Sequence, residues 1–267
     1  MKKYFSFFKM HFVCGLQYRM ASLSALTTQF FWGLMECLAY RALLESSPAG
    51  LPMDYQALVS YIWLKEAFLV LFNTWAADKE FFSVIVDGGI AYEMCRPVSI
   101  YDMWFARNIG GRMATAVLKC IPLLLVAFLV PKPFRMSAPV SFGAFLLFVV
   151  TMLLGAGVTA AFCMVVYMLS FFTISPQGWR MLLTGAVDFL SGNVIPLPFI
   201  PQPYRTVMEL LPFGSMQNVP FRIYSGDLAG SEIPAAIGLQ LFWLCVLILC
   251  GKMICQRAQR RVVVQGG

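Results

Sequence analysis

The chain has 267 residues, of which 60% are hydrophobic and only 12% are charged, and its mean hydropathy is +0.74. Soluble domains carry about 25% charged residues, so this composition excludes a water-soluble globular protein. The net charge of +7 arises from 20 lysine and arginine residues against 13 acidic ones. Basic residues of a membrane protein mark its topology and attract anionic lipids, so we expect a lipid bilayer as a partner and no nucleic acid.

The first 20 residues combine lysines with an aromatic stripe. Phe5, Phe8, Phe12 and Leu16 recur at helical spacing, and the lysines lie off that stripe. This pattern predicts an amphipathic helix over residues 1–20 that lies in the headgroup region of the membrane. A disordered basic tail is the alternative. A lysine and a histidine interrupt the apolar run, so no cleavable signal peptide is expected.

Six apolar stretches follow, each close to the roughly 20 residues that a membrane-spanning helix needs. They occupy residues 21–41, 57–77, 103–130, 140–172, 178–197 and 233–254. They predict an all-α polytopic membrane protein with six transmembrane helices and a single transmembrane domain over residues 1–267.

The distribution of lysine and arginine predicts the orientation of these spans. With the amino terminus in the cytosol, thirteen of the 20 basic residues lie on the inside, five lie outside and two lie within spans. The positive-inside rule therefore places both termini in the cytosol. All eight cysteines fall in spans or inside segments, and His11 is the only histidine, so neither disulfides nor a metal site is expected.

A polar island of charged residues separates the second apolar stretch from the third. Either a soluble protein docks there, or two helices simply need a solvated turn. The sequence contains no G-x-x-x-x-G-K-[ST] motif, so the chain is not expected to bind ATP through a P-loop. The charged residues of this island are Asp78, Lys79, Glu80, Asp87, Glu93, Arg96 and Asp102.

Ionisable residues within the expected spans are candidates for function because charge in a membrane is expensive. Glu36 and Asp188 are the deepest acids, with a role either in substrate or proton handling or in pairing between helices. Lys65 and its neighbour Glu66 are expected to point in different directions and to need other partners. Arg107 and Arg112 lie near enough to the cytosolic end to extend toward water.

The third outside segment, residues 196–232, is rich in proline and yet apolar. We expect it to form a re-entrant or interfacial segment before the last span, the alternative being a plain surface loop. Irregular backbone at membrane depth persists only when it packs on protein or lines a wet cavity. Tyr204, Val207, Met208 and Leu211 follow helical spacing, which predicts a short amphipathic helix within the segment.

This layout resembles the membrane-spanning permease subunit of a type-2 ABC exporter, and two stretches carry the resemblance. Residues 87–99, DGGIAYEMCRPVS, are similar to the coupling helix of that family, in which an acid and a glycine open a short helix that ends in Pro-Val/Leu-Ser. Residues 191–196, SGNVIP, followed by LLPF at 210–213 and by Pro220, resemble its re-entrant region.

The resemblance implies that the chain has no catalytic residues and needs partners. A separate ABC ATPase subunit would bind ATP and Mg²⁺ and dock on the coupling helix, and a second permease, identical or paralogous, would complete the translocation path. The implied location is the bacterial plasma (inner) membrane. The residues implied to contact the ATPase are Asp87, Gly88, Gly89, Ile90, Glu93, Met94, Arg96, Pro97 and Ser99, and those assigned to the pathway or re-entrant region are Glu36, Asp188, Pro196, Pro212 and Phe213.

Other functional classes remain open at this point. An ion-coupled secondary transporter would use Glu36 or Asp188 and would show an internal repeat, which the sequence does not display. A membrane scaffold without transport is the third class. The cargo also stays open among peptides, lipophilic toxins, lipids and glycolipids.

Overall fold

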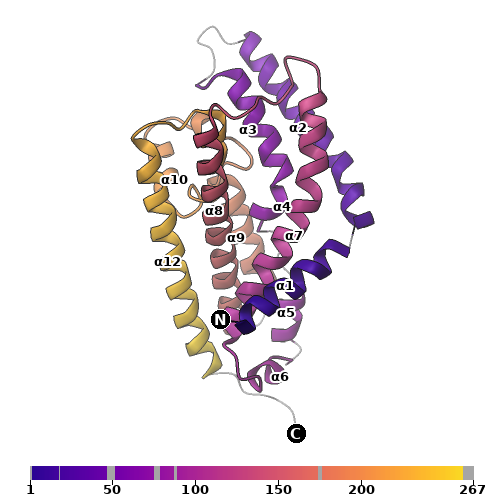
Figure 1. Ribbon diagram of the computed structural model, residues 1–267. Helices are drawn as coiled ribbons and strands as arrows, with labels where there is room; N and C mark the ends of the chain where they lie inside the picture. The colour runs from indigo at the N-terminus through magenta and orange to yellow at the C-terminus, as the bar shows by residue number, and fades with distance from the viewer. Residues whose placement is uncertain are drawn as a thin grey trace.

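The computed structural model describes residues 2–17, 19–46, 52–74, 79–86, 89–173 and 176–260. All regular secondary structure in these ranges is helical (Figure 1). The α-helices are α1 (Lys2–Gln17), α2 (Arg19–Ser46), α3 (Tyr55–Ala67), α4 (Leu69–Phe72), α5 (Lys79–Val86), α6 (Ile90–Met94), α7 (Ile100–Leu129), α8 (Phe142–Leu169), α9 (Pro176–Leu190), α10 (Tyr204–Leu210), α11 (Asn218–Ser225) and α12 (Glu232–Gln259), and two short 3₁₀ helices are η1 (Ser170–Phe172) and η2 (Leu197–Phe199).

Three helices in the described part of the chain are long and apolar enough to cross a membrane. They are α7, the continuous pair α8 and η1 over Phe142–Phe172, and α12. They coincide with the stretches expected over 103–130, 140–172 and 233–254. The stretch expected over 21–41 is also helical, in α2, whereas α9 has only 15 residues and covers the stretch expected over 178–197 only as far as Leu190. The all-α expectation and the membrane location are therefore confirmed.

The helix expected over residues 57–77 is interrupted instead of continuous. It begins at Tyr55, where Asp54 accepts hydrogen bonds from the backbone N–H groups of residues 56 and 57, and it breaks at Phe68. The remaining turn, α4, ends at Phe72. At 1.5 Å per residue, the 13 residues of α3 span about 20 Å, short of the roughly 30 Å hydrocarbon core of a bilayer.

Helix α11 lies inside the bundle and contacts α3 and α8. All its side chains from Asn218 to Tyr224 are buried. The Phe221 ring meets those of Tyr61 and Phe72 edge to face, at centroid distances of 5.5 and 5.6 Å. The proline-rich segment is therefore no plain surface loop, because its second half packs on protein. Helix α10 forms where the spacing predicted it, with Tyr204 and Val207 exposed.

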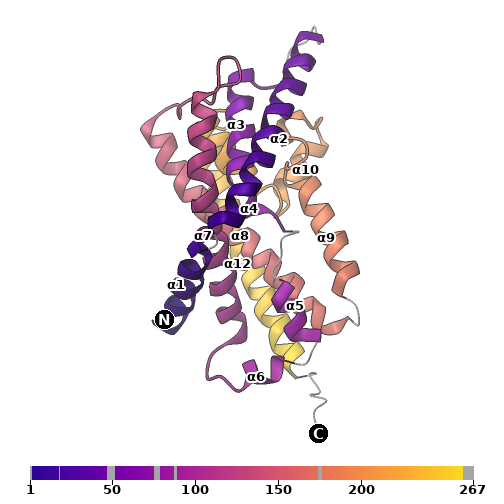
Figure 2. The ribbon, with the colours of Figure 1, turned by 90° about the vertical axis from the view of Figure 1, so that its right-hand side faces the viewer.

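The two ends of the bundle differ in their elements. Helices α5 and α6 lie at the same end as the last turns of α12, whereas the link 130–141 lies at the opposite end (Figures 1 and 2). That link is tied to α3, because the indole of Trp63 donates to the Phe134 carbonyl oxygen at 2.8 Å, and the Ser137 N–H donates to Ser60 Oγ at 3.1 Å. We call the first end the α6 end and the second the α10 end.

The helix expected over residues 1–20 forms as α1, Lys2–Gln17. It packs across α7. A Cβ on Gly110 of α7 would lie 2.8 Å from the Phe8 carbonyl oxygen. Only glycine permits this approach of the two backbones. Phe5 remains mostly exposed, whereas Phe8, Phe12 and Leu16 are half-buried. The aromatic stripe therefore partly covers α7, and its placement in the headgroup region stays a prediction.

Gly155 of α8 offers a test of the contact between α8 and the segment that precedes α11. A Cβ at this position would lie 2.2 Å from the Met216 carbonyl oxygen. We expect Gly155→Ala to destabilise the protein by about 1–3 kcal/mol through overpacking, measured as a lower midpoint of thermal unfolding in detergent.

Gly143, on the same helix, supplies the matched control. The only atom within 4 Å of a Cβ there is a serine oxygen at 3.8 Å. Gly143→Ala should leave the midpoint unchanged or raise it, since alanine restricts the unfolded chain. Equal midpoints for the two variants would contradict the packing of α8 described above.

Candidate functional site

Helix α6 is held against the start of α7 by contacts on both sides of the link between them. The Trp104 indole of α7 donates a hydrogen bond to the Glu93 carboxylate of α6. Ser99 caps α7, since its hydroxyl oxygen accepts from the Asp102 N–H at 3.4 Å. The Ser99 N–H in turn donates to the Tyr4 hydroxyl of α1 at 3.3 Å. The described residues of the polar island from Gly89 to Asp102 therefore form a fixed corner of the bundle.

The exposed part of this corner is narrower than the sequence predicts. Ile90 is only 3% exposed and belongs to the core, so it does not share a docking face with Met94. Glu93 is half-buried and turned toward Trp104. Tyr92, which the sequence did not single out, is 82% exposed. We call the exposed residues the α6 face; they are Tyr92, Met94, Cys95, Arg96 and Pro97.

Two of the residues predicted to contact an ATPase lie outside the described part of the chain, namely Asp87 and Gly88. Gly89 precedes the first residue of α6 and is half-buried. Ser99 is exposed, but it also caps α7. The structure therefore brings the predicted residues from Gly89 to Ser99 to one corner of the bundle. Some of them are buried in its packing, and the others are exposed.

A cleft of about 440 Å³ adjoins the α6 face. It lies between the start of α7 and the last turns of α12, and its lining includes Met94, Val98, Asp102 and Lys252. Lys252 Nζ lies 2.8 Å from an Asp102 carboxylate oxygen. This ion pair joins residues far apart in the sequence, and the spacing of charges along the chain held no signal for it. It gives the α6 end a polar contact between α7 and α12.

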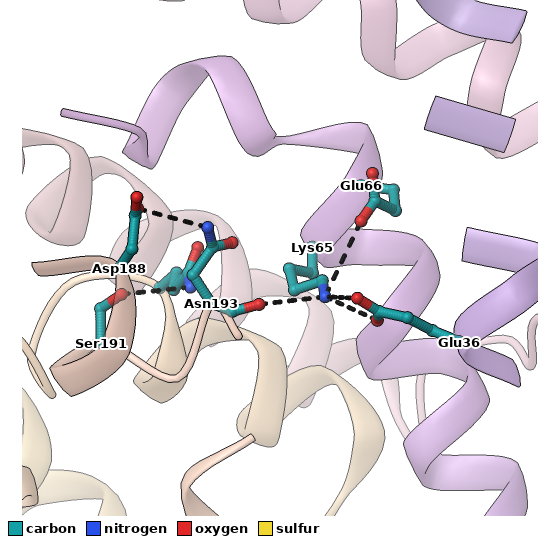
Figure 3. A network of polar contacts seen from close by, with 7 residues as sticks. Glu36, Lys65, Glu66, Asp188, Ser191 and Asn193 are labelled. Carbon is teal, nitrogen blue, oxygen red and sulfur yellow. Dashed lines mark hydrogen bonds and ion pairs between the residues drawn. The ribbon is translucent and has the colours of Figure 1, made fainter. Parts of the chain in front are cut away.

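A second polar cluster is buried among α2, α3 and the turn that follows α9 (Figure 3). Lys65 Nζ donates to both carboxylate oxygens of Glu36, at 2.5 and 2.6 Å, and lies 3.7 Å from the Glu66 carboxylate. It also donates to the Asn193 carbonyl oxygen at 3.1 Å. Glu36 therefore pairs between helices, and Lys65 and Glu66 do interact, contrary to the expected divergence of neighbouring side chains.

Asp188, the other deep acid, belongs to the turn at the end of α9. Its carboxylate accepts a hydrogen bond from the Asn193 side-chain amide at 3.4 Å (Figure 3). Its carbonyl oxygen also accepts from the N–H groups of Asn193 and Val194. Asn193 thus bonds to Lys65 through its backbone and to Asp188 through its side chain. The SGNVIP stretch includes Asn193, but the spacing of its residues does not predict that Asn193 contacts both Asp188 and the lysine that pairs with Glu36.

The sequence predicts that Arg112 extends toward water at the cytosolic end, but its side chain is buried. Its guanidinium donates to the carbonyl oxygens of Asn73, Leu71 and Val70 at 2.6, 3.2 and 3.3 Å. These are carbonyl groups at the end of α4, which a helix end leaves without intrahelical partners. This contact explains why the second apolar stretch stops short. Arg107 lies over the Phe81 ring, 4.6 Å from its centroid.

The residues assigned to the re-entrant region pack within the chain. Pro196 and Pro212 are buried, and the Phe213 ring meets Phe162 of α8 edge to face at 5.4 Å. Ser191 and Gln217 join the turn after α9 to the segment before α11 by a hydrogen bond of 3.4 Å. The five residues assigned to a pathway or re-entrant region therefore divide into two sets. Glu36 and Asp188 have polar partners, whereas the two prolines and Phe213 pack within the chain.

Comparison with known proteins yields one family. The family described as "ABC-2 family transporter protein" matches residues 56–266. No curated protein matches the chain. The matched range begins at α3 and includes the α6 face, but it leaves out α1 and α2.

The Lys65 cluster predicts an asymmetric response to mutation. Lys65→Met leaves two carboxylates in a buried site, and removing one partner of a buried ion pair costs about 3–5 kcal/mol. We expect a loss of folding free energy near the lower bound of this range, because the Glu36 side chain is 22% exposed. Thermal unfolding in detergent measures it.

The double variant Glu36→Gln with Lys65→Met should recover part of that loss, since fewer buried charges remain unpaired. Glu45→Gln serves as the control on the same helix, because Glu45 pairs with Arg41 in an exposed i,i+4 bridge worth less than about 1 kcal/mol. A Lys65→Met variant as stable as Glu45→Gln would rule out a structural ion pair at this site.

Proposed function

This chain belongs to the ABC-2 family of transporter proteins, and we propose that it is the permease subunit of an ATP-driven exporter. The family is a membrane component of transport and not itself the ATPase. Since the sequence has no P-loop, a separate ABC ATPase subunit would bind ATP and Mg²⁺. ATP hydrolysis would then belong to the assembled complex.

The α6 face is the observation that carries this proposal. It presents an aromatic ring at Tyr92, a flexible apolar side chain at Met94 and a cation at Arg96, all exposed at one corner of the bundle. Aromatic, methionine and arginine side chains are enriched where proteins bind one another. The face therefore has the chemistry of a docking site for a soluble subunit, and we assign it to the ATPase.

Contacts behind the α6 face supply a route for coupling. The Trp104 ring, which binds Glu93, packs on Phe81 of α5 at a centroid distance of 4.6 Å. Phe81 in turn packs on Tyr167 of α8 at 4.9 Å. A displacement of α6 by closure of the ATPase dimer would reach α7 through Glu93 and α8 through this aromatic cluster. Closure would thereby change the path between inward and outward access.

The proposed topology has six spans with both termini in the cytosol of a bacterial plasma membrane. Helix α2, with 28 residues, and the pair α3 and α4 would add to the three long spans, together with α9. The clustering of α5, α6 and the end of α12 at one end supports this orientation (Figure 2). A second permease, identical or paralogous, would pack beside this chain and complete the translocation path.

The ion-coupled alternative receives less support from the deep acids. Glu36 is paired with Lys65, and Asp188 bonds to Asn193 in its own turn. Each acid therefore has a partner that accounts for its position. A scaffold without transport would require no ATPase and is separated by the experiment that follows.

Tyr92→Ala and Arg96→Glu should each reduce the recovery of the ATPase subunit with the affinity-tagged chain about tenfold, because loss of an anchoring side chain costs more than roughly 1 kcal/mol. The measurement is the ratio of ATPase to permease after purification from the native membrane in mild detergent.

Lys132→Glu is the matched control, since Lys132 is exposed in the link at the α10 end. It should leave the ratio unchanged. Wild-type ratios in both α6 variants would remove the docking site, and absence of any ATPase with the wild-type chain would favour the scaffold.

A further inference from the structure

An apolar groove runs between α7 and α8 in the half of the bundle toward the α10 end. Two cavities form it, one of about 800 Å³ and one of about 170 Å³. Both are lined by Phe68, Phe148 and Val149, so they adjoin each other. Small-molecule sites have volumes of about 300–1,000 Å³, and the larger cavity alone falls in that range.

The groove opens sideways from the bundle. Its lining side chains Val117 on α7 and Leu153 on α8 are 42% and 53% exposed. Both helices are candidate membrane spans, so the opening lies on the part of the bundle that would be within the bilayer. Aromatic rings line it, and the Phe148 ring meets Phe68 at 6.1 Å and Tyr224 at 5.2 Å, both edge to face. The groove can therefore receive an apolar chain directly from the bilayer.

A polar cavity of about 490 Å³ adjoins the groove at the α10 end. The two share Ala138 and Tyr224 as lining residues. The polar cavity is lined by Asp54 and Asp227, and no lysine or arginine appears among the described residues that line it. One oxygen of the Asp54 carboxylate caps α3, because it accepts from the N–H groups of residues 56 and 57. Arg222 pairs with Asp227 at 2.5 Å from outside that lining.

The donors near this cavity are already used within the chain. The Tyr224 hydroxyl donates to the Ser137 carbonyl oxygen at 3.0 Å, and the Gln56 side-chain amide donates to the Arg135 carbonyl oxygen. Carboxylate oxygens therefore dominate what the cavity offers to a ligand. Carboxylates complement an ammonium group and repel an anionic one.

We propose that the groove and the polar cavity together bind one bilayer phospholipid with an amine headgroup, such as phosphatidylethanolamine. An acyl chain lies between α7 and α8, and the headgroup amine lies near Asp54 and Asp227. An apolar groove beside an acidic cavity matches the acyl chain and the terminal amine of an aminophospholipid, whose phosphate lies between the two. This binding requires neither the ATPase nor transport, so it is independent of the proposed function.

Val149 and Val150 supply a matched pair for the test. They are adjacent on α8 and are 40% and 49% exposed, but only Val149 lines the groove. Each is replaced by tryptophan, and each chain is placed in nanodiscs that contain equal amounts of phosphatidylethanolamine and phosphatidylglycerol. Native mass spectrometry after release into mild detergent counts the phospholipids that remain bound.

The wild-type chain and V150W should retain one phosphatidylethanolamine. V149W should retain it at about tenfold lower occupancy. Equal retention by V149W and V150W would overturn the proposal, and so would equal retention of phosphatidylethanolamine and phosphatidylglycerol by the wild-type chain.

Ala57, which lines the polar cavity, tests the headgroup assignment separately. Ala57→Lys places an ammonium beside the acids and should shift retention from phosphatidylethanolamine toward phosphatidylglycerol. Ala57→Gln adds a side chain of similar length without the charge and should keep the wild-type preference. The same preference in both variants would overturn the assignment of the amine to this cavity.

Discussion

The buried guanidinium of Arg112 is the contact on which the arrangement of the other helices depends. From the middle of α7 it binds carbonyl groups at the end of α4, it donates to the Asn108 side chain at 2.8 Å, and it lies 3.2 Å from Cys163 Sγ of α8. Unpaired carbonyl groups in an apolar bundle would cost several kcal/mol. Arg112 removes that cost, and the chain can therefore leave the bundle after α4 and build the corner that carries α6.

Polar and apolar contacts are divided between the two halves of α7 and α8. Toward the α6 end, Asn108 donates to the Tyr167 hydroxyl at 3.4 Å, and Arg112 reaches Cys163. Toward the α10 end, the apolar groove lies between the same two helices. Directional hydrogen bonds resist sliding, whereas apolar contacts tolerate it. The helices are thus joined firmly where the proposed ATPase would act and loosely near the opposite end.

The long apolar helices could be predicted from composition and length, but the partners of their charged residues could not. The spacing of residues indicates which face of a helix is apolar and says nothing about the element opposite it. Glu36 is therefore recognisable as a deep acid, and Lys65 only becomes its partner in the folded bundle. The break at Phe68 and the end of α4 also lack a proline or glycine signal, and Arg112 bonds to carbonyl groups only at the second of them. Tyr92 carries no charge, so the charge pattern of the island does not predict its exposure.

The burial of α11 has a consequence for the order of assembly. Residues 218–224 fill a space between α3 and α8, which are synthesised long before them. Until this late segment arrives, Tyr61 and Phe72 have no Phe221 ring to cover them. Domains generally begin to fold from the amino terminus during synthesis, but here the contacts of α3 and α8 with α11 can form only after residues 218–224 have been made. The core around Tyr61 and Phe72 is therefore completed by a segment that lies far from both residues in the sequence.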